Sequence, residues 1–337
     1  MASASPQVVI ALLACVVALV TPTPTDEKPA EFSCATSYVT FVMCGRHDDK
    51  RGDYAGRLQN SLDFLFHQAL RFGVRMEVIV VEWNPFPGAS RLASLLRGPP
   101  AQNGSHSPVV RVLTVEPEFH ASVEAGTGEG FFEFMAKNVG ARRARGRFVL
   151  FTNGDVLLND SVMEMLAAEA LEEGSFYRIA RSEVPGLMDP LAPLHMRVAA
   201  VDELLGVLDE ERTCPFGEGE CPGEYNRGVC ERGGEVPARA GAETGAGDHG
   251  GMEDEPFLPA AGDFFLISRE ALHRMGGYHQ VPSTTHLDSL LVCKARGMGM
   301  RQIVLLRPCA LLHQSHPAPG TISRKREILY LPYVKLL

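Results

Sequence analysis

The sequence predicts an α/β protein in which a mainly parallel sheet is flanked by helices on both faces. Short apolar runs of strand length alternate along the chain with longer amphipathic segments of helix length. The apolar runs are continuous, which is typical of strands buried on both faces of a parallel sheet. With 337 residues, of which 45% are hydrophobic, the chain is long enough to bury a sizeable core.

The predicted elements follow one another in a regular order. Strands are expected at 38–44, 76–81, 109–115, 148–151, 176–179, 264–267 and 302–306, and helices at 54–72, 131–145, 161–173, 269–275 and 286–296. In the helix at 54–72, Leu58, Leu62 and Leu65 recur at helical spacing on one face. Asp160 is the expected N-cap of the helix at 161–173.

Residues 214–256 break this alternation, because Gly, Glu and Pro dominate and no apolar periodicity is present. We predict a disordered, acidic, Gly-rich insertion, either a lid over a site or a tolerated loop expansion. The insertion carries most of the net charge of −9. A net charge of −9 argues against a nucleic-acid binder, which would usually show a basic face, and we therefore expect no nucleic-acid partner.

The first twenty residues contain an apolar run, Val8 to Val20, which is shorter than the ~20 residues of a spanning helix. We predict a signal peptide or signal anchor at 1–20, although no Lys or Arg precedes the run. A helix on a soluble protein is the alternative. Residues 21–36 are Thr/Pro-rich and predict a linker. The sequence thus predicts one domain at 37–337 in the secretory pathway (ER or Golgi lumen), secreted or attached to the membrane through the apolar segment.

The cysteines suggest two different roles. Cys214, Cys221 and Cys230 lie in the predicted insertion, where two of them could close a small disulfide loop in a secretory lumen. Cys44, Cys293 and Cys309 lie on predicted core elements and are expected to be small buried hydrophobic residues. The disulfide pairing is left open.

Polar side chains follow four of the predicted strands at the point where each strand ends. They are Asp48 and Asp49, Glu82 and Asn84, Asn153 and Asp155, and His313 and His316. Because the carboxyl ends of parallel strands meet at one edge of a sheet, we expect these side chains to converge on one crevice. Asp155, flanked by Asn153 and Gly154, is placed to hold a divalent cation against a phosphate.

Five segments of this chain resemble the glycosyltransferase A-type (GT-A) fold, in particular family-2-like transferases that use nucleotide sugars. The segments are FVMCGRHDD, VIVVEWNP, KNVGARRARGRFVLFTNGDVLLND, GDFFLISREALHRMGGYHQ and HLDSLLVCKARGMG. They run in the family's order and cover roughly residues 38 to 316, apart from the insertion. The resemblance implies a Rossmann-like GT-A domain.

The resemblance also implies a metal site. Asp155 matches the last acid of the family's metal-binding DxD motif, and Asn153 stands in place of the first acid. His313 or His316 matches the late histidine that completes the site in many such enzymes. Oxygen ligands with one imidazole suit Mn²⁺ or Mg²⁺.

Further roles are implied by position within the matched segments. Glu82 matches an acid that contacts the nucleobase or its ribose, and the nucleotide also lies near Asp48 and Asp49. Lys137 and Asn138 open a helix that approaches the donor sugar or ribose. Asp263 matches an acceptor-side position. Asp288 matches the catalytic base of the inverting members, with a helix-start residue favoured by the helix dipole as the alternative.

The functional expectation is a metal-dependent glycosyltransferase that moves a sugar from a nucleotide-sugar donor to a hydroxyl of a glycan, lipid or protein acceptor, with inversion. One alternative is a catalytically weak or inactive nucleotide- or carbohydrate-binding protein of the same fold, because an amide replaces the first acid of the metal motif. Another is a cytosolic enzyme of the same kind with an uncleaved anchor.

Overall fold

The structure is a computed structural model that describes residues 17–19, 37–47, 53–100, 107–184, 194–201, 257–258, 260–283 and 286–314. Several predictions therefore lie outside the described residues. They concern Asp48, Asp49 and His316, the insertion at 214–256 with its three cysteines, the linker, and most of the apolar N-terminal run.

The helices and strands alternate much as the sequence predicts. In chain order they are β1 (Val17–Leu19), β2 (Val39–Gly45), α1 (Tyr54–Phe72), β3 (Met76–Trp83), α2 (Leu92–Leu95), β4 (Val109–Val115), α3 (Pro117–Val123), α4 (Glu133–Ala141), β5 (Phe148–Thr152), β6 (Val156–Leu158), α5 (Asp160–Ala167), β7 (Ser175–Ile179), β8 (Arg181–Val184), β9 (Phe264–Ser268), α7 (Arg269–Met275), α8 (Leu287–Gly297), β10 (Arg301–Leu305) and β11 (Leu311–Gln314). Residues 194–201 form a further helical segment.

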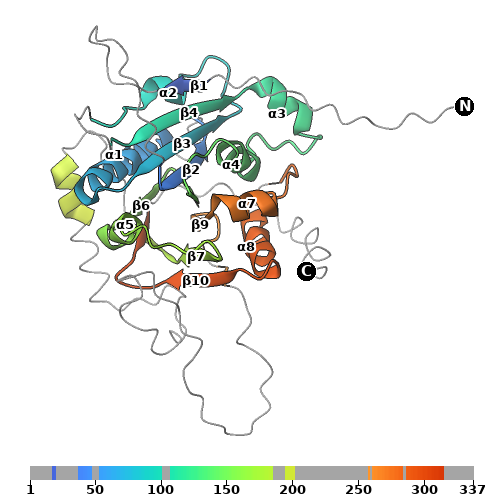
Figure 1. The fold of residues 1–337 in the computed structure, drawn as a ribbon. Helices are drawn as coiled ribbons and strands as arrows, with labels where there is room; N and C mark the ends of the chain where they lie inside the picture. The colour runs from blue at the N-terminus through green and yellow to red at the C-terminus, as the bar shows by residue number, and fades with distance from the viewer. Residues whose placement is uncertain are drawn as a thin grey trace, which may run out of the picture.

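Eight strands form the central sheet in the order β1-β4-β3-β2-β5-β9-β7-β10 (Figure 1). β2 pairs in parallel with both β3 and β5, whereas β9 runs antiparallel to β5 and β7. The predicted α/β architecture with a mainly parallel sheet is confirmed. The chain passes from β2 to β3 and β4 on one side and returns to β5 on the other. The topological switch point therefore lies between the carboxyl ends of β2 and β5, where open α/β sheets bind ligands.

Helices cover both faces of this sheet (Figure 1). α1 and α5 pack on one face through a large hydrophobic cluster, and α4, α7 and α8 pack on the other through a second cluster. Successive side chains of β2 alternate between the two faces, with Phe41 and Met43 in the first cluster and Val42 in the second. The central strand is therefore buried on both sides, which accounts for its continuous apolar sequence.

A second, three-stranded sheet has the order β6-β11-β8. β11 runs antiparallel to β6, with His313 opposite Val156, and parallel to β8. β6 begins directly after the turn that follows β5. This small sheet therefore places β11, which carries His313, close to the carboxyl end of β5.

Three local predictions are corrected by the structure. The helix predicted at 131–145 is shorter, spanning Glu133–Ala141, because a turn closed by the Ala144 N–H to Ala141 O bond follows it. Asn159, not Asp160, is the N-cap of α5, since its Oδ1 accepts from the Val162 N–H. Cys309 is buried as predicted, but it is disulfide-bonded.

No helix within the described ranges has the length and apolar character needed to cross a bilayer.

A buried polar network stabilises the amino ends of the strands, opposite the switch point. Glu77 in β3 accepts from the Thr40 hydroxyl (2.7 Å), from Arg111 Nη2 (2.8 Å) and from the Arg145 N–H (2.6 Å). The Thr40 hydroxyl in turn accepts from the Gly146 N–H (2.8 Å). The network ties three strands to the turn before β5, and its buried carboxylate is fully paired.

The single tryptophan, Trp83, lies at the end of β3 and is completely buried. Its Nε1–H donates to His120 Nδ1 at 2.9 Å, and the rings of Phe119 and Phe132 meet it edge-on, each 6.0 Å away between centroids. The hydrogen bond requires Nδ1 of His120 to be unprotonated. Burial lowers the pKa of His120, so the imidazole is neutral at neutral pH.

We expect acidification below about pH 6.5 to destabilise this part of the fold, because the unfolded chain then binds a proton at position 120 more readily than the folded protein does. The contribution of His120 is present above its unfolded-state pKa and is lost as the pH falls through its lowered folded-state pKa. Trp83 fluorescence measured between pH 8 and 5 should report the change, and His120→Gln should abolish that titration. If His120→Gln gives the same titration curve as the wild type, this account is wrong.

Candidate functional site

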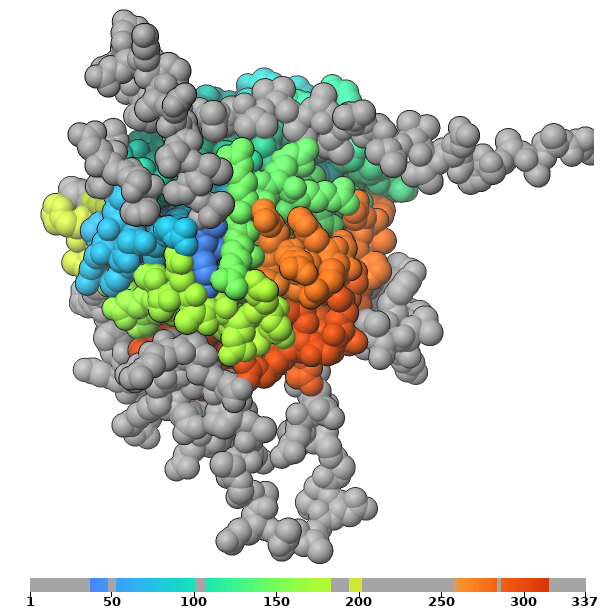
Figure 2. All heavy atoms as spheres, viewed as in Figure 1, coloured from blue at the N-terminus to red at the C-terminus, as the bar shows by residue number. Residues whose placement is uncertain are grey.

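The carboxyl ends of β2 and β5 lie close together at the switch point. The Tyr54 hydroxyl, from the start of α1, donates to the Cys44 carbonyl at 2.8 Å. A Cβ on Gly154 would lie only 2.5 Å from that hydroxyl oxygen, so glycine is required for α1 to approach the turn after β5. On one face of the molecule, segments from the blue beginning, green middle and orange later part of the described chain meet (Figure 2).

Asp155 lies in the turn between β5 and β6 and is almost buried. Its Oδ2 is 3.7 Å from His313 Nε2, which β11 supplies, and 3.9 Å from Arg57 Nε, which α1 supplies. An imidazole and a guanidinium thus both approach the same carboxylate oxygen. Two of the three predicted metal ligands, Asp155 and His313, are brought side by side.

The donor set at this point fits a divalent cation that takes the rest of its ligands from elsewhere. Among the residues that the structure describes, no group of three or more His, Cys, Asp or Glu side chains could hold a metal. One carboxylate and one imidazole nevertheless suit Mn²⁺ or Mg²⁺, which commonly combine one or two protein ligands with phosphate oxygens and water. Asp155 and His313 are the residues that would hold such an ion.

Lys137, on α4, lies at the centre of a second cluster and is completely buried. Its Nζ donates to Glu133 Oε1 (2.6 Å), Asn153 Oδ1 (2.8 Å) and the Gly262 carbonyl (2.7 Å). Burial by itself lowers the pKa of Lys137, but the attraction of Glu133, the hydrogen bond to it and the electrostatic effects of Tyr278 and Cys44 together outweigh burial and hold the pKa above its usual value. The ammonium is therefore permanently charged, and all three of its N–H groups are used within the protein.

Asn153 bridges this ammonium and a buried carboxylate. Its Oδ1 accepts from Lys137, and its Nδ2 donates to Asp263 Oδ1 at 2.7 Å. Asp263 Oδ2 accepts from Arg181 Nη1 at 2.8 Å. An aspartate at position 153 would place its carboxylate against that of Asp263. This geometry gives a physical reason for an amide where the DxD motif has its first acid.

Asp288, in the first turn of α8, lies on the same cluster. A Cβ on Gly262 would lie 3.3 Å from Asp288 Oδ2 and 3.6 Å from Glu133 Oε1, so the two carboxylates approach the same point from different helices. Both side chains are partly exposed, unlike Lys137. The first residue of β9, Phe264, pairs with Thr152 of β5, which places this group beside the carboxyl end of β5.

Two further buried groups complete the surroundings of Asp288. Tyr278 is completely buried, and burial raises the pKa of its hydroxyl above the usual value. The charge of Lys137 lowers this pKa in part, and the charge of Asp288 raises it further. Its oxygen has no hydrogen-bond partner among the described residues. Burial lowers the pKa of Arg178 to about 10, so this guanidinium stays charged at neutral pH near Asp288 and Tyr278.

Two residues that the resemblance places on the nucleotide are engaged within the fold. Glu82 is fully buried and accepts from the Leu92 N–H (2.8 Å) and the Thr114 hydroxyl (3.2 Å), so it caps α2. Asn138 exchanges two bonds with the backbone of Tyr278, at 2.8 and 2.9 Å. Both side chains are buried and already hydrogen-bonded within the fold.

Glu133 is the site residue that the strand-end pattern misses, because it lies at the start of a helix. The signal for it is its spacing of four residues from Lys137, which places the two side chains on one face of α4. The sequence shows that this pair can form. It does not show that the pair is turned toward β5 and β9.

No family model matches this chain, and no curated protein matches it in sequence. Solved structures do match it. One is the mannosyltransferase PcManGT from Pyrobaculum calidifontis in complex with GDP-Man and Mn²⁺, with 16% identity, a TM-score of 0.43, and 87% of this chain and 62% of that chain covered. Another is S. aureus TarS 1-349 in complex with UDP-GlcNAc, with 15% identity, a TM-score of 0.48, and 89% and 66% covered.

A third match is S. aureus TarS 1-349 in complex with UDP, with 15% identity, a TM-score of 0.41, and 82% of this chain and 60% of that chain covered. The chain thus spans about two thirds or less of the length of the solved structures it matches.

Proposed function

We propose that this protein is a metal-assisted glycosyltransferase that moves a sugar from a nucleotide-sugar donor to an acceptor hydroxyl with inversion. The observation that supports it is the pairing of two groups at one switch point. Asp155 with His313 provides ligands for a cation, and Asp288 beside Glu133 provides carboxylates that are partly exposed. The two groups flank the carboxyl end of β5, where a pyrophosphate and a reacting sugar would lie next to each other.

The first group serves the leaving side of the reaction. Asp155 and His313 would hold Mn²⁺ or Mg²⁺, which neutralises negative charge on a departing diphosphate when it is bound. Arg57, whose Nε is 3.9 Å from the Asp155 Oδ2 atom that His313 also approaches, offsets part of the carboxylate's charge. Tyr54 fixes the distance between α1 and the turn that carries Asp155.

The second group serves the attacking side. The Asp288 carboxylate accepts the proton of the acceptor hydroxyl while that oxygen forms its bond to the anomeric carbon of the donor sugar. The bond between the anomeric carbon and the phosphate oxygen breaks, and the nucleoside diphosphate leaves with the bonding electrons. Glu133 accepts a hydrogen bond from a sugar hydroxyl, and its ion pair with Lys137 keeps it oriented.

Asp155→Asn is expected to lower turnover at least about 100-fold, because an amide brings no charge to the cation or to the developing diphosphate. Release of nucleoside diphosphate from a panel of UDP- and GDP-sugars with Mn²⁺ measures it. Asp160→Asn is the matched control, since Asp160 begins α5 and pairs with Arg71 away from the switch point. Wild-type protein that neither binds nor hydrolyses any donor of the panel would remove the support for this function.

A second candidate is a nucleotide- or carbohydrate-binding protein without turnover. The observation that favours it is the position of Asn153, whose amide is engaged by Lys137 and Asp263 and brings no charge to a cation. A binder should bind its ligand equally well after Asp288→Ala and should have no turnover to lose.

A further inference from the structure

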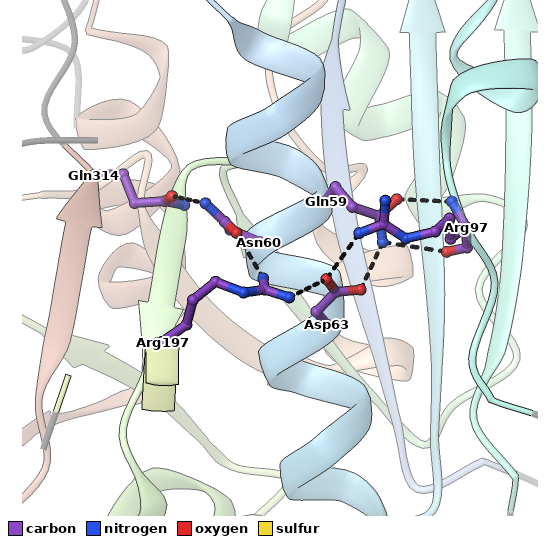
Figure 3. Close-up of polar contacts among 6 residues, drawn as sticks. All are labelled: Gln59, Asn60, Asp63, Arg97, Arg197 and Gln314. Carbon is purple, nitrogen blue, oxygen red and sulfur yellow. Dashed lines mark hydrogen bonds and ion pairs between the residues drawn. The ribbon is translucent and has the colours of Figure 1, made fainter. Parts of the chain in front are cut away.

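A buried polar network links β11 to α1 (Figure 3). Gln314, the last residue of β11 and the neighbour of His313, is completely buried. Its Nε2 donates to the Arg57 carbonyl (3.0 Å) and to the Ser61 hydroxyl (3.2 Å), and its Oε1 accepts from Asn60 Nδ2 (3.1 Å). The side chain of Gln314 is therefore fixed to α1 by three hydrogen bonds.

The backbone of Gln314 makes a fourth bond. Its N–H donates to the Asp155 carbonyl at 2.8 Å. One residue thus joins the turn that carries Asp155 to the helix that carries Arg57. Because His313 directly precedes Gln314, its imidazole position relative to Asp155 depends on where these four bonds hold the end of β11.

The network extends outward to the helical segment at 194–201 (Figure 3). Arg197 Nη1 donates to Asn60 Oδ1 at 2.6 Å, and its Nη2 donates to Asp63 Oδ2 at 2.8 Å. Asp63 also accepts from Gln59 Nε2 (2.7 Å) and from Arg97 Nη2 (3.2 Å). Arg197 therefore orients the Asn60 amide with its Nδ2 toward Gln314.

We infer that Gln314, with Asn60 and Arg197 behind it, is a positioning group that sets the approach of His313 to Asp155 and so the affinity of this pair for a divalent cation. The inference rests on the proposed function. Apolar side chains would fill the same volume without orienting β11. Buried amides with every partner present instead define one geometry for the strand that they join. Outer partners of metal ligands typically change metal affinity by about 10- to 100-fold when removed.

The test is a titration of the full chain with Mn²⁺ alone, followed by the electron paramagnetic resonance signal of the unbound ion. Gln314→Met keeps the length of the side chain but loses its three bonds to α1. We expect it to weaken Mn²⁺ binding by about 10- to 100-fold. Arg197→Met, at the outer end of the network, should weaken binding by a smaller factor, and Arg197→Lys should recover part of the loss.

Thr40→Val is the matched control for stability. It removes the hydroxyl bonds to Glu77 and Gly146 in the buried network at the opposite end of the sheet. Thr40→Val should lower the free energy of unfolding in urea without changing Mn²⁺ affinity. If Gln314 had only a structural role, Gln314→Met would behave in the same way. If Gln314→Met does not fold, the pair of Arg197 variants carries the test.

Two results would overturn the inference, and they differ in what they leave standing. Mn²⁺ affinity that is unchanged in Gln314→Met and in Arg197→Met excludes the positioning role but leaves the cation site intact. A wild-type protein that binds no Mn²⁺ removes the positioning role together with the cation part of the proposed function.

Discussion

Lys137→Met is expected to lower the free energy of unfolding by about 3 kcal/mol, the largest loss of stability that we expect from one substitution in this site. Lys137 is completely buried and provides the hydrogen bonds that Glu133 Oε1, Asn153 Oδ1 and the Gly262 carbonyl accept. Methionine fills similar space but leaves these acceptors without that donor. Because 26% of the Glu133 side chain is exposed, water solvates part of its charge and keeps the loss from being larger.

Urea unfolding monitored by circular dichroism measures this loss. Lys294→Met is the matched control, because Lys294 lies on α8, is only partly buried, and has a single long bond to the Gly277 carbonyl at 3.4 Å. Its free energy of unfolding should change by less than about 1 kcal/mol. In the double variant with Glu133→Gln, the loss should be smaller than the sum of the two single losses, since no unpaired carboxylate remains. Equal losses in Lys137→Met and Lys294→Met would show that the buried ammonium is not a structural centre.

Asp288→Asn is expected to lower the turnover number by about 10²- to 10⁴-fold while the affinity for the nucleoside diphosphate stays unchanged. The amide has the same shape as the carboxylate but cannot accept the proton of an acceptor hydroxyl. The side chain is partly exposed and lies across Gly262 from Glu133, so the substitution leaves the buried cluster around Lys137 intact. Steady-state kinetics and calorimetric binding of the nucleoside diphosphate separate these two effects.

Glu270→Gln controls for the alternative account of Asp288 as a residue that only stabilises a helix start. Glu270 lies in the first turn of α7, as Asp288 does in α8, and it is exposed. Loss of the favourable interaction with the helix dipole costs each variant about 0.3–1 kcal/mol of stability, and only Asp288→Asn should lose turnover. Full turnover in Asp288→Asn would refute its role as the base, and binding without turnover in the wild type would favour the non-catalytic candidate.

Much of the fold could be predicted from apolar patterning. The exceptions are three short strands and the direction of one antiparallel strand. β2, β3 and β5 carry continuous apolar runs, which is the expected sign of strands buried on both faces. The antiparallel direction of β9 leaves no trace in its own residues, because a strand buried on both faces has the same composition in either direction. β6, β8 and β11 have only three or four residues each, too few for a periodic signal.

The candidate site could be predicted where residues follow strand ends, as Asp155 does, and where the resemblance supplied a position, as for Asp288. The sequence does not indicate which of these side chains form bonds within the fold. The resemblance implies that Glu82 contacts a nucleobase or ribose and that Asn138 approaches a donor sugar or ribose, but the structure bonds them to backbone groups of α2 and of Tyr278. Such bonds depend on segments 10 and 140 residues away, whose relative placement only the folded chain defines.

The pairing of β11 with β6 sets the order in which this molecule can become complete during synthesis. His313 pairs with Val156, so the last partner of the Asp155 turn leaves the ribosome long after the turn itself. Contacts of such long sequence separation form late, because the intervening chain must first be closed into a loop. A nascent chain that ends before β11 lacks His313, whose imidazole lies beside Asp155. Under the proposed function, the cation site therefore cannot be complete until β11 has left the ribosome.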